Sequence, residues 1–226
     1  MVRSYTIAAG TVAVRMRGGA SDVHTRAERE FEGISAAFLD RDGVINWNDK
    51  HIHSPDDFEL LPGAAAAIRR LNEAGVPVIV VTNQGAVACQ YVTAETVDDV
   101  LDKMDRVLAA EGAYVDAVYA AYAHPSGSIP YLAIESPYRK PETGMLAQAH
   151  DDLGVHIATS TMVGDATTDI LAGRRAGCRT ILVQTGLAGT DGKVDIKPDH
   201  VVPDLDAAVD LILAAIDPSK PSTDPK

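Results

Sequence analysis

The chain has 226 residues, 46% of them hydrophobic, and a formal net charge of −12. This length can bury one sizeable core, and the alternation of strand and helix patterns predicts a single α/β domain. The acidic balance argues against a nucleic acid or an anionic membrane as partner, because both need a basic face. With only two cysteines and no stretch near the roughly 20 apolar residues of a membrane span, we expect a cytoplasmic protein.

Residues 1–33 are expected to form an extension ahead of the first core strand. The apolar piece at residues 5–14 is short and broken by glycine, and no clear cleavage site follows, so we do not expect a signal peptide. The extension is expected either to add a strand or to pack on a partner subunit. The sequence leaves the oligomeric state open.

A short apolar run at residues 36–39 predicts a buried strand that delivers Asp40 and Asp42 on either side of one residue, followed by Gly43. Open α/β folds bind ligands at this carboxyl edge of the sheet. Two carboxylates so close need a cation or a proton between them. With Mg²⁺ bound, one can attack phosphorus while the other handles the proton. The alternative is a surface turn, for which Asp and Gly are also favoured.

An irregular flap is predicted to follow, through His53. Its main candidates for substrate recognition are Trp47, Asn48, Asp49, Lys50, His51 and His53. Simple packing is an equally good explanation for Trp47.

Further along the chain, a helix is predicted from Pro62-Gly63 to Gly75, and a strand at residues 76–81 carries Thr82. Thr93 is expected to cap the next helix. Four side chains at helical spacing in that helix indicate core packing rather than a ligand site: Val97, Leu101, Met104 and Leu108. The remaining predicted elements are strands at 115–122, 161–163 and 180–183, helices at 169–177 and 205–216, and a disordered tail at 217–226.

The side chains at these strand ends meet the demands of phosphoryl transfer, whose transition state spreads negative charge over three oxygens. Thr82 can donate a hydrogen bond to one oxygen, and Lys140 can neutralise another. Asp165 completes an oxygen-rich Mg²⁺ site, and Asp169 is placed to orient a metal-bound water or the lysine. Right-handed crossovers would bring Asp40, Thr82 and Asp165 to one edge of the sheet.

These motifs resemble those of the haloacid dehalogenase-like (HAD) phosphatases, in particular the heptose bisphosphate phosphatase and histidinol-phosphatase group. The resemblance covers residues 36–216. It implies a Rossmann-like fold with a small flap and loop instead of a large cap domain. It also implies that Asp40 is the nucleophile and Asp42 the general acid/base. Mg²⁺ would be held by the Asp40 side chain, the Asp42 backbone carbonyl and Asp165. Further substrate contacts would come from Asn83, Gln84, Gly85 and Arg139, beside Thr82 and Lys140.

The sequence departs from the pattern of this group at two places. The positions where the group carries zinc ligands hold Ala121, Ala123, Ser136 and Tyr138, so we expect no zinc. Packing of Tyr131, Ile134 and Tyr138 is expected to stiffen this loop instead, with His124 as a polar loop residue. Cys89 stands where the group commonly has a basic residue, which suggests an altered specificity; the thiol itself is expected to pack.

Three hypotheses remain. The favoured one is a Mg²⁺-dependent phosphatase that hydrolyses a small sugar phosphate, such as a heptose phosphate or bisphosphate, through an aspartyl-phosphate. The second is a histidinol-phosphate phosphatase, in which Asp49 or Trp47 would grip the amine. The third is a non-catalytic phosphometabolite-binding or scaffold protein, which has no use for a nucleophile beside an acid.

Overall fold

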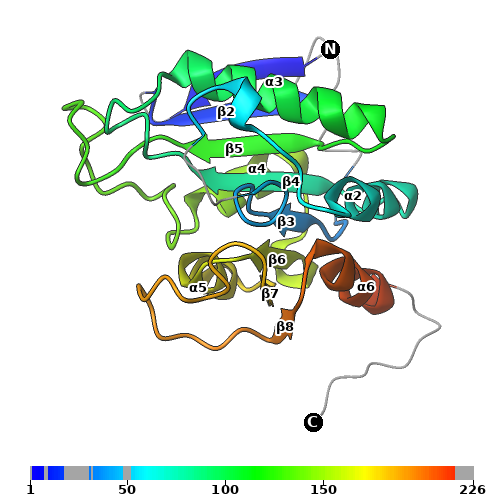
Figure 1. The fold of residues 1–226 in the computed structure, drawn as a ribbon. Helices are drawn as coiled ribbons and strands as arrows, with labels where there is room; N and C mark the ends of the chain where they lie inside the picture. The colour runs from blue at the N-terminus through cyan, green and yellow to red at the C-terminus, as the bar shows by residue number, and fades with distance from the viewer. Residues whose placement is uncertain (1, 8–9, 18–30, 32, 48–51, 217–226) are drawn as a thin grey trace.

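A computed structural model describes residues 2–7, 10–17, 31, 33–47 and 52–216. A single eight-stranded sheet runs through the molecule in the order β1-β2-β5-β4-β3-β6-β7-β8 (Figure 1). The six strands from β5 to β8 in this order are parallel. They are β3 (Ala37–Leu39), β4 (Val78–Asn83), β5 (Ala117–Ala121), β6 (Thr161–Gly164), β7 (Arg179–Val183) and β8 (His200–Val202).

Helices cover both faces of the sheet, because the central strands are apolar on both faces. On one face, α2 (Ala64–Glu73), α3 (Ala94–Ala110) and α6 (Leu205–Ile216) pack in a core that includes Leu39. On the other, α4 (Gly144–Leu153) packs in a core that includes Phe38, and Gly173 of α5 (Thr167–Ala176) lies against Met162 of β6. The described residues also contain two short 3₁₀ turns, η2 (Pro55–Asp57) and η3 (Ile157–Thr159).

The N-terminal extension contributes two antiparallel strands to the sheet, β1 (Val2–Ile7) and β2 (Val12–Arg17), and β2 pairs with β5. Arg15 of β2 is buried and reaches α3, where its guanidinium lies 2.6 Å from Asp102 Oδ1 and 3.1 Å from Asp105 Oδ2. The hairpin is therefore tied to both the sheet and a helix. The domain boundary at residue 34 and a contact with a partner subunit stay predictions.

Most predicted elements are present, with shifts at their ends. Thr93 caps α3 by accepting a 3.0 Å hydrogen bond from Thr96 N, and the predicted apolar stripe of α3 is buried. The strand predicted at 115–122 is shorter, α5 begins two residues early, and β8 was not predicted. No helix in the described part of the chain is both long and apolar enough to cross a membrane. The predicted disordered tail lies outside the described residues.

Candidate active site

Three neighbouring strands bring the predicted site together at the carboxyl edge of the sheet. β3 lies between β4 and β6, with Leu39 opposite both Val80 and Val163. Asp40 follows β3 directly and is held by a 2.9 Å bond from its N–H to the Val163 carbonyl. Thr82 lies near the end of β4, and Asp165 follows β6. The strand order therefore places these three residues at adjacent strand ends, as predicted.

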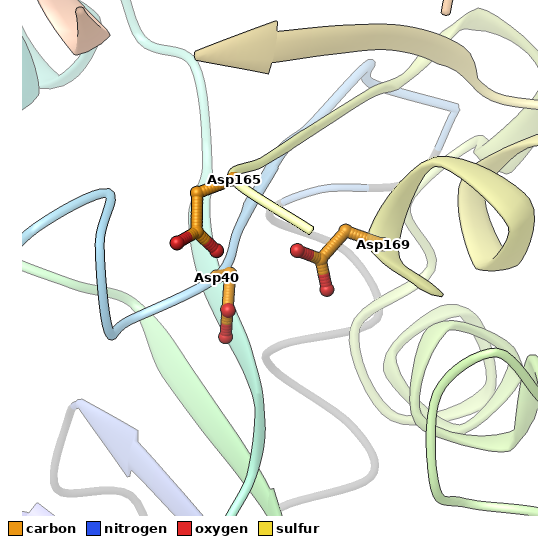
Figure 2. Close-up of side chains that lie close together, drawn as sticks. All are labelled: Asp40, Asp165 and Asp169. Carbon is orange, nitrogen blue, oxygen red and sulfur yellow. The ribbon is translucent and has the colours of Figure 1, made fainter. Parts of the chain in front are cut away.

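Three carboxylates converge at this edge, as Figure 2 shows: Asp40, Asp165 and Asp169 each offer an oxygen atom within 4.8 Å of the others. Asp165 and Asp169 are buried, and the side chain of Asp40 is only 13% exposed. Burial, reinforced by the two neighbouring carboxylates, raises the pKa of Asp40 to about 8. Such a cluster needs positive charge to ionise fully.

Lys140 supplies one such charge from within the protein. Its buried Nζ lies 2.8 Å from Asp40 Oδ1 and 2.7 Å from Asp169 Oδ1, and it donates a 2.7 Å hydrogen bond to the Val81 carbonyl. Burial opposes the charge, but the ion pairs with Asp169 and Asp40 raise the pKa of Lys140 above its ordinary value. Of the two tasks foreseen for Asp169, the structure therefore shows contact with the lysine.

Asn83 holds the backbone of Lys140 in place. Its Oδ1 accepts a 3.0 Å bond from Lys140 N, and its Nδ2 donates a 3.0 Å bond to Lys140 O. The sequence predicted a substrate contact for Asn83, but the side-chain amide is engaged with the protein. This pair of bonds links residues 57 positions apart in the chain.

Asp42 is held by a separate set of donors. Arg41 approaches it with Nη2 at 2.8 Å from both carboxylate oxygens, Asn46 Nδ2 donates to Oδ1 at 2.9 Å, and Gln84 Nε2 donates to Oδ2 at 3.0 Å. Burial works against the charge, yet Arg41 and these hydrogen bonds lower the pKa of Asp42. Gln84 also donates to Thr82 Oγ1 at 2.9 Å, so its amide is bound within the site rather than free for substrate.

A loop after β7, which the sequence interpretation missed, completes the surroundings of Asp165. Leu187 N donates a 2.7 Å bond to Asp165 Oδ2. Gly43 and Gly186 both have positive φ, and a Cβ built on either would lie 2.1 Å from the same oxygen. Thr185 Oγ1 also donates to the Gly43 carbonyl at 2.6 Å. The Thr185-Gly186 pair, separated by one residue from the end of the buried strand β7, was the available signal for this loop.

The loop that carries Arg139 and Lys140 uses one of the three predicted stiffening contacts, the packing of Tyr138. Tyr131 is 62% and Ile134 is 42% exposed, so that prediction is wrong for both. Leu132 is buried instead, and its carbonyl accepts a 3.0 Å bond from His124 N. Leu is compact enough to enter the core where the tyrosine hydroxyl would lose water.

The four positions of the group's zinc ligands contribute to this loop in other ways. Ala121 and Ala123 are buried, and Ser136 Oγ accepts a 3.2 Å bond from the N–H of Tyr138, which packs partly against the core of α4. None of these side chains carries a nitrogen or sulfur ligand. The absence of zinc stays a prediction.

Arg139 and Gly85, two predicted substrate contacts, lie together on the edge of the site. Arg139 Nη1 donates a 3.3 Å bond to the Ala123 carbonyl, and a Cβ on Gly85 would lie 2.9 Å from His124 Cδ2 and 3.0 Å from Arg139 Nη1. The other candidates, Asn48, Asp49, Lys50 and His51, lie outside the described residues.

Family models match both halves of this arrangement. A model of haloacid dehalogenase-like hydrolases matches residues 37–121, which include Asp40 and Thr82, and a HAD-hydrolase-like model matches residues 137–208, which include Lys140 and Asp165. The chain belongs to the haloacid dehalogenase-like hydrolases, and it is a phosphatase of that family.

Curated relatives narrow the assignment. A D-glycero-D-manno-heptose-1,7-bisphosphate 7-phosphatase of Thermosynechococcus vestitus is 40% identical over 191 residues, which cover 81% of this chain and 97% of the relative. The D-glycero-beta-D-manno-heptose-1,7-bisphosphate 7-phosphatase of Escherichia coli K12 is 34% identical over 186 residues, or 82% of this chain and 91% of the relative. The chain is thus related to the heptose 1,7-bisphosphate phosphatases.

Solved structures agree with this relationship. A HAD-like phosphatase from Mesorhizobium loti has a TM-score of 0.76 at 33% identity and covers 95% of this chain, with 97% of its own length matched. A D,D-heptose 1,7-bisphosphate phosphatase from B. bronchiseptica, in complex with magnesium and phosphate, has a TM-score of 0.70 at 34% identity, covering 80% of this chain and 98% of its own. Both support the α/β fold without a large cap domain.

Proposed function

We propose that this protein is a Mg²⁺-dependent phosphatase that hydrolyses a sugar phosphate of the heptose bisphosphate kind through an aspartyl-phosphate. The observation that carries the proposal is the position of Lys140, whose ammonium joins Asp40 and Asp169 at the edge of a three-carboxylate cluster. A nucleophilic carboxylate and a cation for the phosphoryl oxygens are thereby in contact before any substrate binds.

The residues present fit a magnesium ion. Asp40 and Asp165 offer hard oxygen ligands, and Gly43 and Gly186 leave free the space beside Asp165 Oδ2 that a Cβ would fill. When bound, the ion would neutralise carboxylate and phosphate charge. The B. bronchiseptica relative in complex with magnesium and phosphate supports this choice of metal. The Asp42 backbone carbonyl stays a proposed ligand.

The proposed reaction begins when Asp40 attacks phosphorus. A bond forms between its carboxylate oxygen and phosphorus, while the bond from phosphorus to the sugar oxygen breaks. Lys140 neutralises charge on the transferring group, and Thr82 donates a hydrogen bond to one of its oxygens. The leaving oxygen takes a proton from Asp42. Asp42 then accepts a proton from water, whose oxygen attacks phosphorus and releases Asp40 and inorganic phosphate.

The surroundings of Asp42 suit the second of these steps, because Arg41 and two amides favour the ionised base. In the first step Asp42 must carry a proton. A bound phosphate places negative charge beside Asp42, and this raises the pKa of the carboxyl. Substrate binding is therefore expected to prepare Asp42 as the acid.

The heptose bisphosphate substrate class rests on the names of the relatives, which are 34% to 40% identical to this chain. The test is phosphate release with saturating Mg²⁺ from heptose 1,7-bisphosphate, other sugar phosphates and histidinol phosphate. Asp40→Asn is the inactive variant, and Asp151→Asn, at an exposed carboxylate of α4, is the matched control.

Turnover of the heptose bisphosphate that disappears in Asp40→Asn but not in Asp151→Asn would support the mechanism and the substrate together. Preference for histidinol phosphate would overturn the substrate and keep the mechanism. Silence of the metal-loaded wild type on every ester would contradict the proposal and favour a non-catalytic phosphate-binding protein.

A further inference from the structure

Trp47 is an exposed aromatic side chain fixed to the machinery of the site. Residues 43–46 of the flap are buried, whereas Trp47 is 44% exposed. Its N–H donates a 3.1 Å bond to the Glu59 carbonyl, and its own carbonyl accepts a 2.8 Å bond from Asn46 Nδ2. The same amide group donates to Asp42 Oδ1 at 2.9 Å. The backbone of Trp47 is thus one side chain away from the proposed acid.

Leu187 is the corresponding exposed side chain on the loop after β7. It is 40% exposed, although its N–H is bonded to Asp165 Oδ2 at 2.7 Å. The two loops meet directly, because Thr185 Oγ1 donates to the Gly43 carbonyl at 2.6 Å. A Cβ on Gly43 would also lie 3.2 Å from the Cα of Gly186. Trp47 and Leu187 therefore rise from adjoining loops, each anchored to a carboxylate of the site.

Single exposed apolar residues are ordinary on protein surfaces and need no explanation. Val201, which is 55% exposed on the edge strand β8, is such a residue, since no described contact joins it to the site. Trp47 and Leu187 differ because the Trp47 carbonyl shares the Asn46 amide with Asp42, and the Leu187 N–H binds Asp165 directly. Both loops are therefore held at the edge of the sheet where a phosphate at Asp40 would bind.

We propose that Trp47 and Leu187 form an apolar rim at the mouth of the site, which packs against the C–H face of a sugar ring and selects cyclic over open-chain sugar phosphates. An aromatic ring offers a flat apolar surface with little conformational entropy to lose, and the C–H face of a pyranose matches it. This inference rests on the proposed phosphatase function and adds a determinant of its substrate class.

Steady-state kinetics on a matched pair of substrates tests the rim: mannose 6-phosphate, which forms a ring, and mannitol 1-phosphate, an open chain with the same number of carbons. Trp47→Ala and Leu187→Ala are compared with the wild type and with the control Val201→Ala. We expect kcat/KM for the cyclic ester to fall about tenfold or more in Trp47→Ala through KM, and to fall less in Leu187→Ala. The open-chain ester should change less than about twofold, and Trp47→Phe should retain most of the preference.

Fluorescence gives a readout that does not depend on turnover, because Trp47 is the single tryptophan of the chain. In the Asp40→Asn variant, mannose 6-phosphate is expected to change the emission of Trp47, whereas inorganic phosphate and mannitol 1-phosphate are not. Equal losses on both esters in Trp47→Ala, or emission unchanged at a mannose 6-phosphate concentration shown by calorimetry to bind, would overturn the rim.

These outcomes separate the rim from the phosphatase function. If the wild type hydrolyses both esters and Trp47→Ala shows no selective loss, the rim fails while the proposed function stands. If no ester is hydrolysed but mannose 6-phosphate still changes the emission selectively, the phosphatase function fails while the rim stands as a binding surface.

Discussion

Replacement of Gly186 by alanine is expected to damage the metal site far more than the fold. Gly186 has a φ of +61°, and a Cβ there would lie 2.1 Å from Asp165 Oδ2. Non-bonded heavy atoms approach to roughly 3.5 Å at their closest favourable separation, so the carboxylate would have to move by about 1.4 Å. Asp165 is buried and bonded to Leu187 N, so it cannot move without breaking that bond.

The same loop contains a matched control. Gly192 has a φ of +64°, but no atom lies within 4 Å of a Cβ built there. Alanine at either position carries the cost of left-handed backbone, about 1 to 2 kcal/mol. Only Gly186→Ala adds the clash with Asp165, and a 1 Å misplacement of a reacting group costs on the order of 100-fold in rate, or about 2.7 kcal/mol.

The assay is Mg²⁺-dependent phosphate release, together with thermal unfolding of the metal-free protein. Gly192→Ala should lower the melting temperature by a few degrees and keep its activity. Gly186→Ala should lose about 100-fold in kcat/KM, with weaker Mg²⁺ binding by calorimetry. If the two variants lose the same activity, or if Gly186→Ala binds Mg²⁺ like the wild type, then the free space beside Asp165 is not what the metal site requires.

Three further predictions use contacts of the described residues. Asn83→Ala should lower kcat for phosphate release about 10- to 100-fold, because the backbone of the buried Lys140 loses both of its bonds to Asn83. The control is Asn72→Ala, which removes a similar pair of bonds to Tyr114 at the opposite edge of the sheet. It should lower the stability in thermal unfolding and leave kcat unchanged. Leu132→Ala should destabilise the fold by about 2 to 5 kcal/mol in urea unfolding, and Tyr131→Ala by less than about 0.5 kcal/mol; similar values would refute the role of Leu132 as the loop's anchor. A proton competes with Mg²⁺ for Asp40, whose pKa is raised to about 8. The Mg²⁺ affinity measured by calorimetry should therefore increase as the pH rises toward about 8, by up to about tenfold per pH unit. An affinity that does not change with pH would contradict the raised pKa.

The main elements and the meeting of the acids could be predicted because each depends on a local pattern. The apolar runs before Asp40 and Asp165 do not alternate with polar residues, which is typical of parallel strands that are buried on both faces. Right-handed crossovers then leave few possible orders for these strands in the sheet. The observed order places β3 between β4 and β6, which is the arrangement that brings these acids beside Thr82. Four residues after Asp165, Asp169 falls on the first turn of α5, as the spacing implied.

The direction of the amide side chains could not be predicted in the same way. Asn83 and Gln84 follow a predicted strand at the carboxyl edge of the sheet, so the sequence interpretation assigned both as substrate contacts. Their partners, Lys140 and Asp42, are 57 and 42 residues away in the chain, and no local pattern encodes such bonds. Polar groups buried at the site need hydrogen-bond partners, because an unpaired charge or polar group in the interior costs free energy, and the two amides supply these bonds.

The N-terminal hairpin shows a different limit. The alternation of Val12, Val14 and Met16, all buried on one face of β2, was a strand signal in the sequence. The pairing partner of this strand could not be predicted from the sequence, because β5 lies about a hundred residues later in the chain. In addition, the charged Arg15 within the strand argued against a buried position. Its ion pairs with α3 explain why a charged residue lies there.

An open site without a large cap has to recognise its substrate with the loops that also hold its catalytic groups. At Trp47 the two tasks are divided within one residue: the backbone carbonyl fixes Asn46, and through it Asp42, while the side chain is exposed. The same division holds at Leu187, whose N–H binds Asp165. Side-chain substitutions at these two positions can therefore change which sugar is accepted while the acids stay in place. In such a site, catalytic residues and substrate range are expected to diverge at different rates.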